Sequence, residues 1–568
     1  MHTFWYNSID RSGKEAAIMT PDLDPKALEN LDKQTLITMF MMVSESNKNL
    51  QRTVEQLNKN IQLLTEEVAS LKQARFGRKS EKGLSVMDGQ YVLIFNETEV
   101  TIDLHKEDLP TEEADEAQET SVSAHKRKKP VGKRKEDLSK IQDREIVTHE
   151  LSEEELLALF PDGRWSRLPD EVYERAELIP SRLKVYEHHV AVYKGTASRK
   201  IVKAPRPNDL LRNSIATPGF VAAVGNAKYV NAIPVNRLCD EIERIDNVRI
   251  LPQDMCYWLN TSANRYLCKM TGRLHAEIAH CHVVQADETP CLVNKDDRPA
   301  GSKSYMWVYR SGSYEDHPFI LYDYQKTRKS DHPREFLKDF HGICVTDGYQ
   351  VYHTIADERP DLTIAGCMAH AKRKFADVVK TMGKASKGTF AEKALGLIDT
   401  MYHFEKQYTD LSPEDRLQKR QERIAPLLDV FFSYLKTEGA SIAPKSKTGE
   451  AIAYCLNQEK YLRVFLTDGA VPMDNNAAER SIRPFCLGKK NWQIIDTVSG
   501  ARASAIWYSL AETAKANNLK PYEYFKYLLE EIPKHGEFED ESYLEDLLPW
   551  SESIPEYCRK PDENKVQN

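Results

Sequence analysis

The sequence predicts an α/β fold: a mixed core with a helical insertion, preceded by an N-terminal coiled coil and by small helical or mixed regions. Three observations support this prediction. Leucines recur every seventh residue near the start, short β-rich runs alternate with helical segments between about 280 and 380, and residues 385–465 have a helical pattern. A chain of 568 residues is too long for a single core, so we expect several domains.

Residues 25–75 are expected to form a leucine-zipper coiled coil. Apolar residues occupy one position of a heptad repeat from Leu36 to Leu71, and the position three residues before each of them is also mostly apolar. Leucine at d combined with β-branched residues at a favours two parallel strands, and Asn47 at an a position would fix their register. The pattern therefore predicts a homodimer joined through this segment.

Two alternatives fit the leucine pattern less well. A helix packed on its own domain has a wider apolar stripe with a period of 3.6 residues rather than strict sevens. A basic-zipper DNA-binding protein carries its basic helix directly before the zipper, whereas residues 21–35 are acidic. We therefore favour the intermolecular coiled coil.

A charged linker is expected over residues 76–145. An acidic run is followed by a basic run at 125–135, in which seven of eleven residues are cationic. This composition is typical of a segment that stays disordered until it meets a polyanion, and such binding would not depend on base sequence. Charge runs are often only solvated, so DNA contact and solvation are both open. The cationic residues are Lys126, Arg127, Lys128, Lys129, Lys133, Arg134 and Lys135.

Two smaller regions precede the core. Residues 146–200 have a mixed, partly β pattern, and residues 201–280 alternate apolar helical faces with short polar turns. We expect a small β-containing module followed by a helical region. A helix-turn-helix over residues 231–260 is one interpretation, but a plain packing role for these helices is the simpler one.

The order of elements between residues 280 and 380 predicts the type of core. Three β-rich runs (HVVQAD, SYMWVYRSG, PFILYDY) precede a helix, a fourth strand (GICVTDG) and a strand-helix unit (LTIAGC, AHAKRKFADVVKTM). This order is typical of a ribonuclease H-like mixed α/β core. Its first part is expected at 281–384 and its last part at 466–505, separated by the helical insertion. A C-terminal helical domain at 506–550 and a tail at 551–568 complete the chain.

The insertion carries a basic helical face formed by Lys419, Arg420 and Arg423. A DNA-lining role and a solvated surface both fit this face, and solvation is favoured because most charged helix faces are solvated. A helix start is predicted at Ser412 and Pro413, because serine is a favoured N-cap and proline suits the first turn.

Three acidic residues are candidates for a divalent-metal site. Asp287 is expected at the end of the first strand and Asp347 at the end of the fourth, and these strands are neighbours in such a sheet. Glu479 lies in a helix expected to cross the sheet. Mg²⁺ prefers oxygen ligands, and two ions about 3.5–4 Å apart stabilise the attacking and leaving oxygens of an in-line displacement. If the three carboxylates converge, the chain cuts or joins a phosphodiester backbone.

Each acidic residue also has a purely structural explanation. A strand-end aspartate often caps the following turn, and Glu479 with Arg483 matches an exposed i,i+4 ion pair worth about 0.3–0.5 kcal/mol. Asp474 is a competing ligand, but its place before a helix predicts an N-cap whose carboxylate is occupied by backbone N–H groups. We therefore favour Glu479 as the third ligand.

The bulk composition is that of a globular protein. No run of about 18 apolar residues occurs and the start lacks a signal-peptide pattern, so we expect a cytoplasmic protein. The ten cysteines form no CxxC pair, which argues against a zinc cage or a disulfide framework. The formal net charge is −8, so any nucleic-acid binding depends on local basic patches rather than on the total.

Several unusual motifs together carry a family resemblance. They are FGRKSEK after the zipper, TPGFVAAVGNAKYVNAIPVNR, ADETP, VTDGY, GCMAHAKRKF, DNNAAERSIRPFCLGKKNW, and a closing AIWYSLAETAKANNLKPYEYFKYLLEEIP with DLLPW. In these motifs, which span most of the chain, the sequence resembles the transposases of bacterial insertion sequence 66 elements, the TnpC type of the DDE superfamily.

The resemblance implies a DNA transposase in which Asp287, Asp347 and Glu479 form the DDE triad. It implies two Mg²⁺ ions, with Mn²⁺ as a substitute, and cleavage followed by strand transfer. The implied partners are double-stranded DNA at the terminal repeats and target DNA in the bacterial nucleoid, and similar elements often encode accessory proteins. The family's zinc module is built on cysteine pairs, but residues 150–195 contain none, so we expect no zinc as a cofactor.

Further residues beside the motifs are candidates for DNA contact. Arginine suits phosphate oxygens, and Trp492 would either stack on an unpaired base or pack in the core. Cys367 and His370 are open between DNA-side and structural roles, with His370 favoured as a packing histidine. The basic candidates are Lys372, Arg373, Lys374, Arg480, Arg483, Lys489 and Lys490.

Two other function classes compete with a transposase. A non-catalytic DNA-binding or scaffolding protein would dimerise through the zipper, but three intact carboxylates disfavour it. A ribonuclease H-like nuclease would cut DNA without joining it, and only a strand-transfer assay with pre-cut element ends separates it from a transposase.

Overall fold

The computed structural model describes most of the chain from residue 209 onward and shorter pieces before it. The described residues are 32–76, 84–87, 90–93, 152–159, 182–194, 201–205 and 209–561, apart from 213, 300 and 537–539. By internal contacts the chain divides into two compact units, residues 1–78, 190–243 and 248–568, and residues 79–189 with 244–247. The basic run at 125–135 and most of 146–200 lie outside the described residues.

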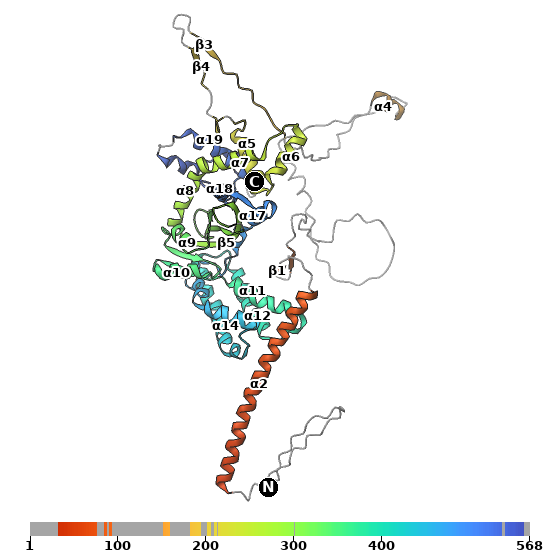
Figure 1. The fold of residues 1–568 in the computed structure, drawn as a ribbon, viewed down its shortest axis with the longest axis vertical. Coiled ribbons are helices and arrows are strands. Elements are labelled where there is room, and N and C mark those ends of the chain that lie inside the picture. The colour runs from red at the N-terminus through yellow and green to blue at the C-terminus, as the bar shows by residue number, and fades with distance from the viewer. Residues whose placement is uncertain are drawn as a thin grey trace. The chain divides into compact units, whose positions relative to one another are not determined.

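The segment predicted to be a coiled coil is a single helix, α2 (Lys33–Phe76), 44 residues long (Figure 1). Asp32 caps its start, because its carboxylate accepts hydrogen bonds from the backbone N–H groups of Gln34 and Thr35 at 2.9 and 3.1 Å. The heptad leucines whose side chains the structure describes are exposed, with Leu50 at 62% and Leu57 at 54%. The helix is as predicted, while its pairing with a second copy stays a prediction.

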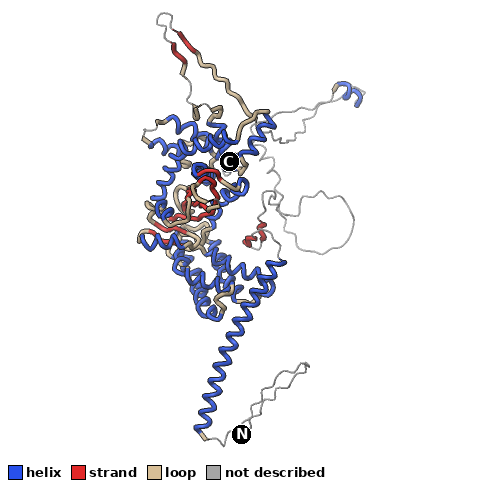
Figure 2. The backbone as a smooth tube through the Cα atoms, viewed as in Figure 1, coloured by secondary structure: helices blue, strands red, loops and turns tan. Residues whose placement is uncertain are grey.

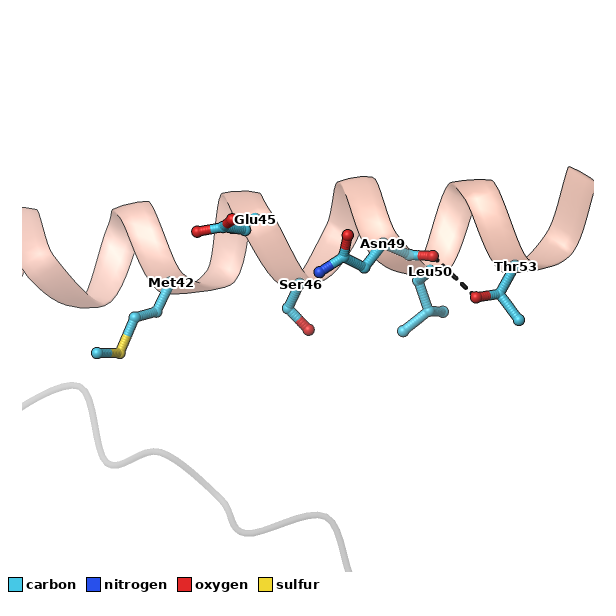
Figure 3. Close-up of a pocket in the computed structure, with 6 residues that line it drawn as sticks. All are labelled: Met42, Glu45, Ser46, Asn49, Leu50 and Thr53. Atoms are coloured by element: carbon cyan, nitrogen blue, oxygen red, sulfur yellow. Dashed lines mark hydrogen bonds between the residues drawn. The ribbon is translucent and has the colours of Figure 1, made fainter.

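Small polar and apolar side chains of α2 project from one side of the helix between residues 42 and 53. Met42, Ser46, Leu50 and Thr53 point the same way, and the Thr53 hydroxyl donates a hydrogen bond to the Asn49 carbonyl oxygen at 2.9 Å (Figure 3). This bond satisfies the threonine within the helix. The exposed apolar surface of α2 consists of the heptad leucines together with side chains such as Phe40, Met42 and Ile61.

Short elements occur between α2 and residue 205. They are a hairpin of β1 (Leu84–Met87) and β2 (Gln90–Leu93), helix α4 (Glu153–Leu159), and a hairpin of β3 (Val192–Lys194) and β4 (Ile201–Lys203). His188 and His189 are exposed, and His189 pairs with Glu187 at 3.1 Å.

The core is the predicted mixed α/β arrangement, built on one mixed sheet (Figure 2). The strands follow the order β7-β6-β5-β8-β9, and β10 also pairs with β5. Strands β5, β6 and β7 are antiparallel, whereas β8 and β9 run parallel to β5. Their bounds are β5 Val283–Lys295, β6 Lys303–Ser311, β7 Ile320–Gln325, β8 Gly342–Val345, β9 Leu362–Ala365 and β10 Ile495–Thr497. Helices α9 (Asp331–Phe336) and α10 (Gln350–Glu358) flank β8 in the sequence.

Helix α18 (Val498–Ala516) covers β7, the edge strand of the sheet, and bonds its free backbone N–H groups. The backbone N–H groups of Ile320 and Tyr322 on β7 donate to the hydroxyl groups of Thr513 and Ser509, at 3.0 and 2.8 Å. An unpaired edge strand is a template for aggregation, and covering it with a helix removes that hazard. Because α18 is an integral cover of β7, it spans the boundary predicted between residues 505 and 506.

Helices before and after the sheet pack around α18. They are α5 (Pro218–Gly225), α7 (Pro252–Ser262), α8 (Cys268–Ala276) and α19 (Pro521–Glu531). Helix α6 (Val235–Asp246) contacts α7, where the Cys239 thiol donates to the Met255 sulfur at 3.6 Å. Gly225 on α5 is required by this packing, because an added Cβ would lie 2.5 Å from the Trp507 ring of α18. The sequence between 209 and 280 is therefore part of the core's packing.

The insertion between the two parts of the core is helical. Its main helices are α12 (Phe390–Gln407), α13 (Pro413–Lys419), α14 (Ala425–Thr437), α15 (Lys447–Asn457) and α16 (Glu459–Leu462). Ser412 is the N-cap of α13 and accepts from the Asp415 N–H at 3.1 Å, as predicted. The helices share a buried apolar cluster with α11 (Met368–Met382), for example through Phe375, Ile398 and Phe431.

The basic face predicted on the insertion is wrong for Arg420. This arginine is 0% exposed, pairs with the carboxylate of Glu405, and donates to the carbonyl oxygens of Phe465, Asp468 and Val471 at 2.8, 3.1 and 2.9 Å. A buried guanidinium is tolerated only when its donors are satisfied. Here the guanidinium donors bind the carbonyl oxygens of the loop that follows the insertion. Arg420 therefore stabilises the fold and does not face DNA.

Candidate active site

The sheet places Asp287 and Asp347 near each other. On adjacent parallel strands, Gln285 of β5 lies beside Val345 of β8, and the β8 pairing ends there. Asp287 and Asp347 each lie two residues beyond this pair, Asp287 after Gln285 and Asp347 after Val345. Asp287 was expected at a strand end, but β5 continues to Lys295 because β6 pairs with it as far as Leu292. Asp287 therefore lies in the middle of β5. Pairing with β8 has ended just before it, while pairing with β6 continues past it.

A tight turn fixes Asp347 just beyond β8. Its Oδ1 accepts a hydrogen bond from the Tyr349 N–H at 2.9 Å, and its carbonyl oxygen accepts from the Tyr454 hydroxyl at 3.3 Å. Gly348 has φ of 89°, a conformation that side chains disfavour. The turn-capping role that strand-end aspartates often have is thus present, with one carboxylate oxygen left for other contacts.

Glu479 lies in the first turn of α17 (Asn476–Trp492), which packs over β5 and β6 (Figure 1). The residue before this helix, Asn475, ties it to the sheet by donating from Nδ2 to the Ala286 carbonyl oxygen at 2.8 Å. Arg310 on β6 donates to the Ala477 carbonyl oxygen at 3.3 Å. These bonds attach the start of α17 next to Asp287, the neighbour of Ala286.

The helix-cap role predicted for Asp474, the competing ligand, needs one correction. Asn475, not Asp474, occupies the N-cap position of α17. Asp474 nevertheless has its carboxylate occupied, because it accepts from the Asn476 N–H at 3.0 Å and from the Tyr402 hydroxyl at 3.0 Å. Because these donors fill the oxygens of Asp474, Glu479 is the more available ligand.

The carboxylates interact electrostatically. Burial, and then the charges of Glu288, Asp347 and Glu479, together raise the pKa of Asp287 to about 8, against a backbone hydrogen bond from the Glu288 N–H that lowers it. A buried carboxylate that three others repel favours a divalent cation, which would stabilise its charged form. The donor set is all oxygen, which suits Mg²⁺ or Mn²⁺.

Sequence reasoning missed a fourth acidic residue, Glu288. Its side chain is 2% exposed, pairs with Arg328, and leaves Oε2 buried without a hydrogen-bond partner. Burial, and then the charge of Asp347, raise its pKa to about 7. Arg328 also stacks 3.7 Å from the centre of the Tyr349 ring. The signal was present in the sequence, since Glu288 directly follows Asp287, but its partner Arg328 is 40 residues away.

One group of three donor residues within the described ranges has all its ligand atoms within 4.8 Å of one another, namely Cys367, His370 and Glu479. Asp287 and Asp347 are not in this group. The structure thus gathers the three predicted carboxylates as electrostatic neighbours without closing them around one point.

The predicted DNA-contact residues divide into exposed and engaged ones. On α11, Arg373 donates to Glu479 at 3.1 Å and Lys372 pairs with Asp399 at 2.8 Å, while Lys374 lies over the Tyr454 ring. On α17, Arg480, Arg483 and Lys490 are exposed, and Lys489 donates to the Pro290 carbonyl oxygen at 2.6 Å. Trp492 is half-buried, with Lys228 above its ring.

An α/β core with a carboxylate cluster at the sheet and basic helices beside it is the construction of a DNA-processing transposase core. Residues 213–503 match the protein family described as Transposase IS66 family, and residues 509–550 match the IS66 C-terminal element. Residues 63–147 match a model described as Transposase C of IS166 homeodomain. The chain belongs to the IS66 transposase family and is a transposase of an insertion sequence.

Similar proteins occur in Sinorhizobium fredii. The protein y4hP is 27% identical over 504 residues, which cover 85% of this chain and 87% of the relative. The protein y4jD is 27% identical over 523 residues, which cover 90% and 98% respectively. Both are described as uncharacterized. Among the described residues, no helix is both long and apolar enough to cross a membrane.

Proposed function

We propose that the chain is a DDE transposase with a ribonuclease H-like core that cleaves DNA at the ends of its element and transfers the strand. The observation that supports this proposal most directly is that Asp287 on β5, Asp347 just after β8 and Glu479 on α17 lie near enough for the charges of Asp347 and Glu479 to act on Asp287. The strand order β7-β6-β5-β8-β9, with three antiparallel strands followed by two parallel ones, supports the ribonuclease H-like assignment.

Asp287, Asp347 and Glu479 would hold the divalent ions. When bound, two Mg²⁺ ions activate the attacking oxygen and stabilise the leaving oxygen of a phosphodiester. Asp287, from the rigid middle of β5, provides the fixed point of the site. Arg373 neutralises Glu479 while that carboxylate has no cation, and the exposed Arg480 and Arg483 of α17 provide phosphate contacts along the bound strand.

The Glu288–Arg328 ion pair would tune the charge of the site and help to position Asp347. A carboxylate with one orphaned buried oxygen beside Asp347 adds negative potential to the centre. Arg328 balances it and also packs on Tyr349, whose N–H holds Asp347. Glu288 is thus proposed as a positioning residue for Asp347.

Dimerisation through α2 is the second part of the proposal. A 44-residue helix that leaves its heptad leucines exposed is more stable when a second copy covers them. A dimer would present two active sites to the two ends of one element. DNA at the terminal repeats, target DNA and accessory proteins of the element are the proposed partners.

The test is a cleavage assay with purified protein, labelled terminal-repeat DNA and Mg²⁺. Asp287→Ala should lose cleavage and keep DNA binding, while Asp331→Ala, which alters an exposed aspartate on α9, should keep both. Equal cleavage by Asp287→Ala would remove Asp287 from the mechanism. Joining of pre-cut ends by the wild type separates a transposase from a nuclease that only cuts.

A further inference from the structure

A second set of metal-binding atoms shares Glu479 with the proposed Mg²⁺ site. Cys367 occupies the N-cap position of α11, His370 lies in the first turn of that helix, and Glu479 comes from α17. Their ligand atoms all lie within 4.8 Å of one another. Unlike the Asp287 side of the site, this side offers sulfur and nitrogen as well as oxygen.

The imidazole of His370 is available as a ligand. Its Nδ1 is buried without a hydrogen-bond partner, and its Nε2 lies 3.8 Å from Oε1 of Glu479. A packing histidine normally has its buried nitrogen satisfied, so the packing role favoured from the sequence does not account for this one. The Arg373 guanidinium lies 3.5 Å from Nε2, and that arginine side chain is 53% exposed, so this nitrogen can exchange the contact for a cation.

The thiol of Cys367 lies in surroundings that favour a metal-bound thiolate. It is fully buried, and its Sγ accepts a hydrogen bond from the Asn475 backbone N–H at 3.2 Å. While no cation is bound, this buried sulfur is a protonated thiol rather than a thiolate. A cation would displace that proton to solvent, and the N–H donor would then stabilise the thiolate.

The ion pair between Arg373 and Glu479 can be replaced by a cation. Arg373 donates to both carboxylate oxygens, at 3.1 and 3.4 Å, but its side chain is 53% exposed. An arginine that is largely exposed loses little when it turns into solvent, since solvent-exposed ion pairs contribute little to stability. An incoming cation therefore replaces Arg373 at small cost.

We propose that Cys367, His370 and Glu479 form a binding site for one thiophilic divalent cation of the Zn²⁺ class. Sulfur and imidazole ligands select Zn²⁺, Co²⁺ or Cd²⁺ over Mg²⁺. Three protein ligands and an open fourth position match an accessible tetrahedral site, in which ligand atoms stand roughly 3.3–3.8 Å apart. The His370–Glu479 separation already fits, and the widest pair needs to close by about 1 Å. The lack of cysteines in residues 150–195 does not bear on this site.

A consequence for catalysis rests on the proposed function. A cation held by Cys367 and His370 would take Glu479 from the Mg²⁺ ions, so micromolar Zn²⁺ should inhibit cleavage in the presence of millimolar Mg²⁺. Inhibition is measured for each variant as the ratio to its own rate in Mg²⁺ alone. Metal binding is measured without DNA, so its result is independent of whether the protein cleaves.

The test is titration of the full-length, metal-free protein with Co²⁺, followed by absorption spectroscopy. The wild type should bind one equivalent with a sulfur-to-cobalt charge-transfer band in the near ultraviolet and strong tetrahedral bands in the visible. Cys367→Ser should lose the charge-transfer band, and His370→Gln should bind at least tenfold more weakly. Cys268→Ser, whose thiol only donates to the Asn264 carbonyl oxygen, should behave as the wild type.

Three results would overturn the site: no charge-transfer band in the wild type at one equivalent, the same band in Cys367→Ser, or full affinity in His370→Gln. Far-ultraviolet circular dichroism checks the fold of each variant. If Cys367→Ser does not fold, His370→Gln decides alone, because that side chain is partly exposed at the start of a helix.

Discussion

Replacing Asp287 by asparagine should stabilise the metal-free protein at alkaline pH. In the folded state the pKa of Asp287 is raised from 3.8 to about 8 by burial and then by neighbouring carboxylates. Between these values the folded state holds a proton that the unfolded state has released. The free energy of unfolding therefore falls as pH rises through this window. Asparagine has the same shape and no charge to bury, so it removes this loss.

The size of the effect follows from the shift. Each pKa unit corresponds to about 1.4 kcal/mol, so a shift of about four units gives a ceiling of about 5–6 kcal/mol at pH 8. Local water and movement of the neighbouring carboxylates relieve part of it, and we expect a gain of about 2–5 kcal/mol. The gain should shrink toward zero as pH falls to about 4.

Urea unfolding with tryptophan fluorescence measures this effect, because Trp307 is fully buried on β6 of the same sheet. Mg²⁺ at about 100 times its dissociation constant should stabilise the wild type by about 2.7 kcal/mol at pH 8 and leave Asp287→Asn unchanged. The matched control is Asp323→Asn on β7, since burial raises the pKa of Asp323 to about 6 without a carboxylate cluster. It should keep the full Mg²⁺ response. Asp287→Asn that is no more stable than the wild type at pH 8 would refute the reasoning.

Three further predictions concern the scaffold. Arg420→Met should destabilise the core by about 3–5 kcal/mol in urea unfolding, because three carbonyl oxygens lose their guanidinium donor and the buried Glu405 carboxylate keeps only Arg416 as a partner. Lys419→Ala, in an exposed pair, should cost about 0.5 kcal/mol or less, and equal losses would contradict the assignment. Leu57→Lys should raise the dimer dissociation constant about a hundredfold or more in sedimentation equilibrium, since each copy loses the burial of one leucine; an unchanged constant would remove α2 from the interface. In thermal unfolding, Gly488→Ala should cost about 1–3 kcal/mol of stability, because its Cβ would lie 2.2 Å from the Tyr508 hydroxyl. Gly272→Ala, which has open space in α8, should be neutral or stabilising in the same measurement.

The sequence predicted the order of elements in the core well because each strand is a short apolar run between turn residues. The first and fourth predicted strands, β5 and β8, were predicted as neighbours, and the register of Gln285 beside Val345 explains why Asp287 and Asp347 are electrostatic neighbours. The length of β5 was not predictable. It depends on pairing with β6 and β10, which local pattern does not reveal.

Long-range partners account for the other differences. Arg420 is part of a basic run in the sequence, but its buried acceptors lie at residues 465 to 471 and on Glu405, so only the fold shows that it is internal. Cys367 and His370 form a simple C-x-x-H spacing, while the third member of their group, Glu479, is more than a hundred residues away. Arg328 is similarly distant from Glu288. Each of these contacts joins segments that a local pattern treats separately.

The central claim is that Asp287, Asp347 and Glu479 together hold divalent ions, and its most direct test is an anomalous-difference map of crystals grown with Mn²⁺ and terminal-repeat DNA. The account predicts manganese peaks coordinated by oxygens of Asp287 and Asp347, with Glu479 as a ligand of one of them, and loss of these peaks in Asp287→Ala. A well-ordered DNA complex with no manganese at Asp287, or with manganese bound only away from these three carboxylates, would contradict it.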